Sequence, residues 1–193
     1  MKKKIIIPIG IVALFLVIGF IIFDNNKIVS TITLDINPSI EINLTRNEKV
    51  KSVVALNEDA KEIVNGNLKG KSIDDTLKQI TDNLIEIGYV AEGNFVEIIL
   101  YSEGDISNKE LETKLKETLE KKKIDSNITT IKKVSKEDEE LAKKYDVSPA
   151  KISYIKSIIK DNENINIEDL SNKSVSELME TKETGKYCEI DYM

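Results

Sequence analysis

The sequence predicts an α+β protein: a single N-terminal transmembrane helix, then a domain whose elements run β-β-α-β-α-β and end in small helices. Three patterns predict this class: an apolar run near the N-terminus, a long alternation of apolar and polar residues, and several helical segments that begin at Ser. The order indicates a sheet covered on one side by two helices. The predicted segments are a cytoplasmic stub (1–4), the transmembrane helix (5–23), an extracytoplasmic α+β domain (24–134) and a C-terminal helical extension packed on it (135–193).

The transmembrane helix is predicted from residues 5–23, which contain no charged side chain. At a rise of about 1.5 Å per residue the run covers roughly 28 Å, close to the ~30 Å hydrocarbon core. A cleavable signal peptide is the alternative, but its apolar part is shorter and ends in small residues. Lys2–Lys4 precede the run, so the N-terminus is expected in the cytoplasm and the domain outside. The sequence thus predicts a single-pass protein of the cell membrane with the lipid bilayer as a partner.

The first predicted strand covers residues 31–45, where the side chains alternate between apolar and polar. This period of two is typical of a half-buried strand. Residues 46–48 are expected to form a hairpin turn, and residues 49–56 the returning strand. The apolar face consists of the even positions Ile32, Leu34, Ile36, Pro38, Ile40, Ile42 and Leu44.

Two helices and two further strands are expected next. Ser72 begins a helix that Gly88 ends, and Ser107 begins a second helix with the capping-box pattern Ser-Asn-Lys-Glu. The strands are predicted over residues 95–101 and 127–134 because these segments are rich in β-branched residues. Small helices then begin near Ser135, Ser148 and Ser174.

The composition excludes several classes of function. The 193 residues include no His and one Cys, so catalytic sites that use His and intrachain disulfides are excluded. Three of the 28 basic residues are Lys2–Lys4, and the rest of the chain carries 25 basic and 34 acidic residues, a net charge of -9. An acidic domain argues against nucleic-acid binding. The sequence indicates no cofactor, no metal site and no enzyme for an external substrate.

Pro38 stands out because it interrupts a predicted strand, where it cannot donate a backbone hydrogen bond. It follows Asn37, and this pair has a specific chemistry. The usual degradation of Asn needs the backbone nitrogen of the next residue, which Pro does not offer. The side-chain nitrogen of Asn37 can instead attack its own backbone carbonyl, form a succinimide and cut the chain at Pro38. A fold can accelerate this slow reaction by fixing the attack geometry.

The alternation places Asp35, Asn37, Ser39 and Glu41 on one face of the predicted strand. Asp35 or Ser39 is expected to accept the proton from the attacking amide or to supply one to the leaving nitrogen. Two alternatives stay open from the residues alone. Pro38 fits a bulge in an edge strand without any chemistry, and Ser39 offers an attack on the carbonyl of Pro38.

Residues 33–41, Thr-Leu-Asp-Ile-Asn-Pro-Ser-Ile-Glu, resemble the D-x-N-P-S-x-E signature of RsgI-type anti-sigma factors. The similarity extends through residues 50–59, 68–72 and 88–89 to Ser-Pro-Ala-Lys at 148–151, which is similar to the S-P-G-K helix start of that family. It implies self-cleavage at Asn37–Pro38 with fragments that stay associated. It also implies two partners, an intramembrane protease and a sigma-factor regulatory partner.

The sequence also departs from the pattern of this family. Only residues 1–4 precede the apolar run, so the cytoplasmic anti-sigma domain of the family is expected to be absent. We therefore expect a membrane-anchored, RsgI-like signalling module that cuts itself by Asn cyclisation, with Asn37, Pro38, Asp35, Ser39 and Glu41 as its site. The alternative is a membrane-tethered interaction or structural domain that uses the same fold without cleavage.

Overall fold

The computed structural model describes residues 26–160 and 165–188. A five-stranded sheet in the order β3-β2-β1-β4-β5 forms the centre of the described part. Neighbouring strands are antiparallel except for the parallel pair β4 and β5. The strands are β1 (Ile28–Asp35), β2 (Ser39–Thr45), β3 (Val50–Ala55), β4 (Phe95–Gly104) and β5 (Asp125–Thr130).

Helices account for much of the remaining described chain. Five of them begin at a predicted Ser, whose hydroxyl accepts a hydrogen bond from the amide three residues later: Ser72, Ser107, Ser135, Ser148 and Ser174. Gly88 ends α3 in the left-handed conformation that the sequence predicted for it. The helices are α2 (Ala60–Ile63), α3 (Ile73–Ile87), α4 (Asn108–Glu120), α5 (Lys136–Tyr145), α6 (Pro149–Lys160), α7 (Ile167–Ser171) and α8 (Val175–Cys188).

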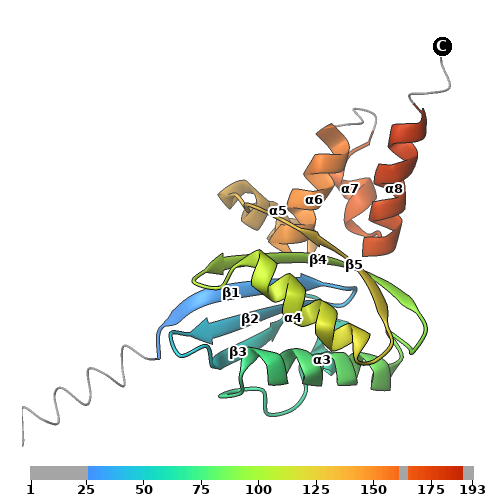
Figure 1. Ribbon diagram of the computed structural model, residues 1–193. Coiled ribbons are helices and arrows are strands. Elements are labelled where there is room, and N and C mark those ends of the chain that lie inside the picture. The colour runs from blue at the N-terminus through green and yellow to red at the C-terminus, as the bar shows by residue number, and fades with distance from the viewer. Residues whose placement is uncertain (1–25, 161–164, 189–193) are drawn as a thin grey trace, which may run out of the picture.

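Helices cover both faces of the sheet (Figure 1). On one face, α3 and α4 pack against the even-numbered residues of β1 and β2, and this is the larger of two apolar cores. On the other face, Ile99 of β4 packs with the apolar side chains of α6, α7 and α8. The sequence predicted that two helices cover one side of the sheet. The structure has a second helical layer on the other side, formed by the C-terminal helices.

The predicted fold class needs correction. The segment 31–45 is not one strand: β1 ends at Asp35 and β2 begins at Ser39, so the described fold has five strands and seven helices instead of the order β-β-α-β-α-β. Within the described ranges no helix is long and apolar enough to cross a membrane. The predicted stub 1–4 and transmembrane helix 5–23 lie outside those ranges.

The register explains why the alternation concealed the turn. Asp35 pairs with Ser39, and Leu34 with Ile40, so even residues of β1 lie opposite even residues of β2. A connection of three residues preserves this parity, and both strands then present their even positions to the same core. The period of two consequently runs through the turn without a break.

Candidate functional site

The turn between β1 and β2 contains the predicted Asn37–Pro38 bond. Asp35 and Ser39 form the last strand pair, and Ile36, Asn37 and Pro38 connect them. The amide of Ile36 donates a 3.0 Å hydrogen bond to the carbonyl of Pro38. Both strands are interior to the sheet, so Pro38 is not a bulge in an edge strand. The bond lies at the end of a hairpin, where the backbone reverses direction.

Asn37 has an unusual backbone conformation. Its φ angle is 61°, in the left-handed region that few residues other than Gly adopt. Asn tolerates this region better than most residues, but the conformation still costs about 1–2 kcal/mol. The side chain of Asn37 is exposed, whereas Pro38 is buried. The turn therefore holds the residue expected to react in a strained conformation and fixes its neighbour in the protein interior.

Asp35 is a completely buried carboxyl group, with 0% of its surface exposed. The hydroxyl of Ser148, at the start of α6, donates a hydrogen bond to its Oδ2 atom. Its Oδ1 atom is buried and has no hydrogen-bond partner among the described residues. Burial raises the pKa of the Asp35 carboxyl above its usual value, while the hydroxyls of Ser148 and Ser39 and the charge of Lys151 act in the opposite direction.

Ser39 is fixed mainly through its backbone. Its amide donates a 3.1 Å hydrogen bond to Oδ1 of Asn57, and its carbonyl accepts a 2.9 Å hydrogen bond from Leu56. The same oxygen of Asn57 accepts a 3.2 Å hydrogen bond from the amide of Ala60, the first residue of α2. Asn57 thus ties the turn to the segment after β3.

The structure brings four of the five predicted site residues to the turn. Asp35 and Ser39 flank Asn37 and Pro38, but Glu41 lies two pairs further along β2, opposite Thr33. The Oε1 atom of Glu41 accepts a 2.7 Å hydrogen bond from the side-chain amide of Asn43. Glu41 therefore belongs to a separate polar pair on β2, on the same face of the sheet.

No local pattern in the sequence assigns a part in the site to Asn57, Ser148 or Lys151. The pattern Ser-Pro-Ala-Lys at 148–151 predicted the start of a helix, and Ser148 does accept a 2.9 Å hydrogen bond from the amide of Lys151. That pattern carries no signal for the second contact of Ser148, which joins it to a residue 113 positions earlier in the chain. Only the packing of α6 on β1 and β4 shows it.

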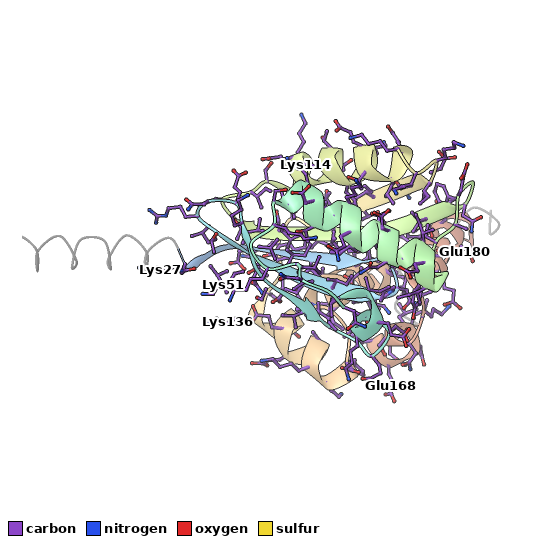
Figure 2. The ribbon with its side chains drawn as sticks, turned by 90° about the horizontal axis from the view of Figure 1, so that it is seen from below. Lys27, Lys51, Lys114, Lys136, Glu168 and Glu180 are labelled. Atoms are coloured by element: carbon purple, nitrogen blue, oxygen red, sulfur yellow. The ribbon has the colours of Figure 1, made fainter. Side chains whose placement is uncertain are left out.

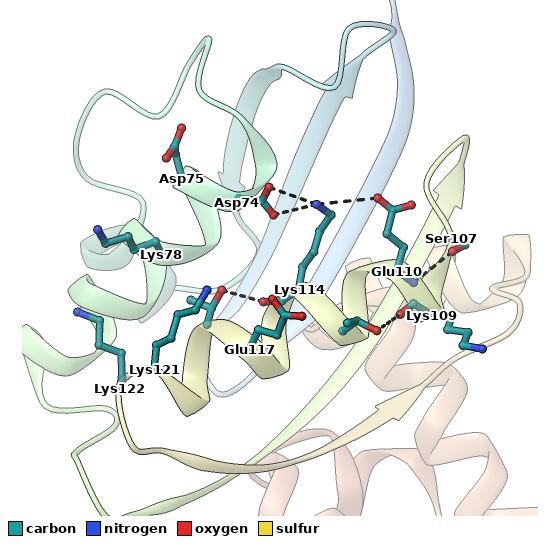
Figure 3. Close-up of a pocket in the computed structure, with 12 residues that line it drawn as sticks. Asp74, Asp75, Lys78, Ser107, Lys109, Glu110, Lys114, Glu117, Lys121 and Lys122 are labelled. Carbon is teal, nitrogen blue, oxygen red and sulfur yellow. Dashed lines mark hydrogen bonds and ion pairs between the residues drawn. The ribbon is translucent and has the colours of Figure 1, made fainter.

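A second candidate region is the groove between α3 and α4, with a volume of about 850 Å³ (Figure 3). Its side chains carry both signs of charge. Lys114 of α4 lies 2.9 Å from Asp74 of α3 and 4.0 Å from Glu110, and Lys122 forms an ion pair with Asp82. The pair of Lys114 with Asp74 and the pair of Lys122 with Asp82 connect α3 to α4 and to the residues directly after it, which is a structural role. The groove lies on the helical layer opposite α6 and contains none of the predicted site residues.

Among the described residues, no group of three or more Cys, Asp and Glu side chains has the arrangement of a metal site. Figure 2 shows the labelled Lys114, Lys136 and Glu168 on different sides of the domain.

The hairpin with its Asn-Pro turn lies inside a sheet covered by helices on both faces, and a family model matches this part of the chain. The sequence model of the family described as "Anti-sigma factor RsgI-like central domain" matches residues 29–157, from β1 into α6. The chain belongs to this family of RsgI-type anti-sigma factors.

The relatives extend the similarity over most of the chain. Anti-sigma-I factor RsgI7 of Acetivibrio thermocellus is 26% identical over 169 residues, which cover 85% of this chain and 31% of that protein. Anti-sigma-I factor RsgI of Bacillus subtilis is 32% identical over 157 residues, which cover 76% of this chain and 39% of that protein. The chain therefore spans less than half the length of these relatives.

Proposed function

We propose that this domain is a signalling module that cuts its own backbone between Asn37 and Pro38. The side-chain nitrogen of Asn37 bonds to the backbone carbonyl carbon of the same residue and gives up one proton. The bond from that carbon to the nitrogen of Pro38 then breaks, and the nitrogen leaves with the electron pair and takes up a proton. The products are a fragment that ends in a succinimide at residue 37 and a fragment that begins with a free amine at Pro38.

The observation that carries this proposal is the position of the Asn-Pro bond in a constrained turn. The φ angle of Asn37 is 61°, and the strand pair Asp35–Ser39 holds both ends of the three-residue connection. Pre-organised geometry of this kind is what an amide nitrogen, a poor nucleophile, requires for attack. A flexible Asn-Pro sequence lacks this constraint.

Asp35 and Ser39 are the groups that we propose to move protons. In its ionised form the carboxylate of Asp35 accepts the proton that the attacking amide loses, and the hydroxyl of Ser39 takes part in returning one to the nitrogen of Pro38. Oδ1 of Asp35, which has no hydrogen-bond partner among the described residues, is the atom available for this. We give Glu41 a supporting role only, through its hydrogen bond with Asn43.

After cleavage the two fragments are expected to stay together. The N-terminal fragment would contribute β1, which is paired with β2 on one side and with β4 on the other. Ile32 and Leu34 of β1 are 0% and 1% exposed, and burial of such side chains contributes about 1.5–3 kcal/mol each. The cut chain would therefore keep its fold until something withdraws β1.

Separation of the fragments is the step that we propose to carry the signal. Membership in an anti-sigma factor family supports a sigma factor as the final target. We propose in addition that an intramembrane protease acts on the released N-terminal part. The expected location at the outside of the cell membrane is based on residues 2–23 of the sequence, which lie outside the described residues. Fractionation of cells that produce the full chain tests that location.

Intact mass spectrometry and denaturing gels of the full chain test the cleavage. We expect two bands, a fragment that begins at Pro38, and a partner fragment that is one water lighter than hydrolysis would give, until the succinimide opens. Asn37→Ala should give one uncut band. Asn47→Ala is the matched control, because Asn47 is an exposed Asn in the next hairpin turn and precedes Glu48 instead of a Pro.

Other outcomes would point elsewhere. A new fragment that begins at Ser39 would show that the hydroxyl of Ser39 attacks the carbonyl of Pro38. A chain that stays whole during long incubation in its folded state would contradict self-cleavage. It would favour the alternative of an interaction or structural domain that is not cut.

A further inference from the structure

Ser148 connects the C-terminal helices to the turn. It is completely buried, and its hydroxyl oxygen accepts a 2.9 Å hydrogen bond from the amide of Lys151 in the first turn of α6. The hydroxyl proton is donated to Oδ2 of Asp35 at the end of β1. One side chain thus starts a helix and holds a carboxyl group that lies 113 positions away in the sequence.

The other helix-initiating Ser residues do not make such a contact. Ser107 accepts a hydrogen bond from the amide of Glu110 within its own helix start. Ser72 donates to Asp75, again within its own helix start. Ser148 differs because its proton goes to another element, and to a buried carboxyl group. Capping of α6 alone does not require that contact.

The charge of Lys151 acts on the same carboxyl group. Lys151 is 6% exposed, and its positive charge lowers the pKa of Asp35. Burial lowers the pKa of Lys151 itself, and the carboxylates of Asp35 and Glu177 counteract that effect. From the elements packed around Asp35, the groups that influence its ionisation are therefore Ser148 and Lys151 at the start of α6 and Ser39 on β2, with Glu177 of α8 acting on Lys151.

We propose that the first turn of α6 positions Asp35 for the cleavage of the Asn37–Pro38 bond, with Ser148 as the positioning residue and Lys151 as its charged support. This inference rests on the proposed self-cleavage. Ser148 binds Oδ2 and thereby leaves Oδ1 of Asp35 as the oxygen that accepts the amide proton. The C-terminal helices, which pack on the sheet far from the turn in sequence, therefore determine whether the hairpin is competent to cut.

A cleavage time course tests the proposal. The full chain is made by cell-free translation, and the uncut fraction is followed on denaturing gels at a series of pH values. Ser148→Ala should slow cleavage about tenfold or more, as expected for the loss of a hydrogen bond to a charged group. Ser148→Thr keeps a hydroxyl and a helix cap, so it should restore the rate. Ser107→Ala removes an equivalent cap from α4 and should leave the rate unchanged.

The pH profile separates positioning from general destabilisation. Cleavage that needs ionised Asp35 increases with pH through the pKa of that group. Ser148→Ala removes a donor that lowers this pKa, so the rising part of the profile should move to higher pH. Lys151→Met keeps the cap and removes the positive charge, and it should move the profile in the same direction. If Ser148→Ala does not fold, Lys151→Met tests the proposal in its place.

The failures of the two proposals are distinguishable. If the unmodified chain is never cut, both proposals fail. If it is cut, and both α6 variants keep its rate and its pH profile, only the role of α6 is overturned. Equal slowing by Ser148→Ala and Ser107→Ala, with no change in the pH profile, would likewise reduce Ser148 to a structural cap.

Discussion

Retention of β1 after cleavage can be tested with two Ile residues on the same strand. Ile32 is 0% exposed and pairs with Ile42 on one side and Ser102 on the other, whereas Ile28 is 48% exposed. Truncation of a fully buried Ile to Ala costs about 2–5 kcal/mol. At about 1.4 kcal/mol per tenfold change, Ile32→Ala should weaken the association of the two fragments by roughly 30-fold to 4,000-fold. Ile28→Ala should change it only about twofold, as most surface substitutions do.

The assay follows the N-terminal fragment on the cut protein. The full chain is purified in mild detergent, allowed to cut, and immobilised through a C-terminal tag, and the fragment that remains is measured over time by gel. Rapid loss from Ile32→Ala and retention by Ile28→Ala are the expected results. Equal retention by both variants, once both are fully cut, would refute the reasoning that buried side chains of β1 hold the fragments together.

Three further predictions concern stability. Each is measured by thermal or urea unfolding in a chain that also carries Asn37→Ala, the variant expected to stay uncut. Burial raises the pKa of Asp35 above its usual 3.8, so ionisation of this carboxyl group destabilises the folded state as the pH rises. Asp35→Asn should therefore be more stable than the parent protein above pH 3.8 and equally stable below it. A difference that does not change with pH would contradict this. Asn57→Ala leaves two backbone amides without their acceptor and should lower the free energy of unfolding by about 1–3 kcal/mol; an unchanged value would mean that water replaces the side chain. Gly104→Ala places a Cβ atom 2.0 Å from the carbonyl oxygen of Val29 and should be clearly more destabilising than Gly93→Ala, which has a similar positive φ and no close neighbour; equal effects would rule out the clash.

The sequence indicated where the candidate site lies, but it did not predict the geometry of the backbone there. The Asn37–Pro38 pair was identifiable because the backbone nitrogen of Pro carries no hydrogen and cannot make the usual attack on the Asn side chain. The turn itself was not, since Asp35 pairs with Ser39 and a three-residue connection keeps the even residues on one face. Alternation reports which side of a sheet a residue faces, and it is insensitive to a reversal of direction that preserves parity.

Contacts between segments that are far apart in the sequence could not be predicted from local sequence patterns. Ser-Pro at 148–149 correctly predicted the start of a helix, because capping depends only on adjacent residues. The hydrogen bond from Ser148 to Asp35 depends on where α6 packs, and no spacing in the sequence encodes it. The C-terminal helices were predicted to pack on the domain, but the face of the sheet that they cover was not predicted, for the same reason.

The position of β1 in the middle of the sheet has a consequence for reversibility. Removal of a border strand shortens a sheet, but extraction of this one would split it into two pairs, β3 with β2 and β4 with β5. Each pair would then expose a row of unsatisfied amides and carbonyls toward a gap one strand wide. Exposed strand edges of this kind tend to pair with each other or with a strand of another molecule. We therefore expect the gap to close before β1 could return. Extraction of β1 would then be irreversible for that molecule, and the cell would have to synthesise new protein to restore the uncleaved state.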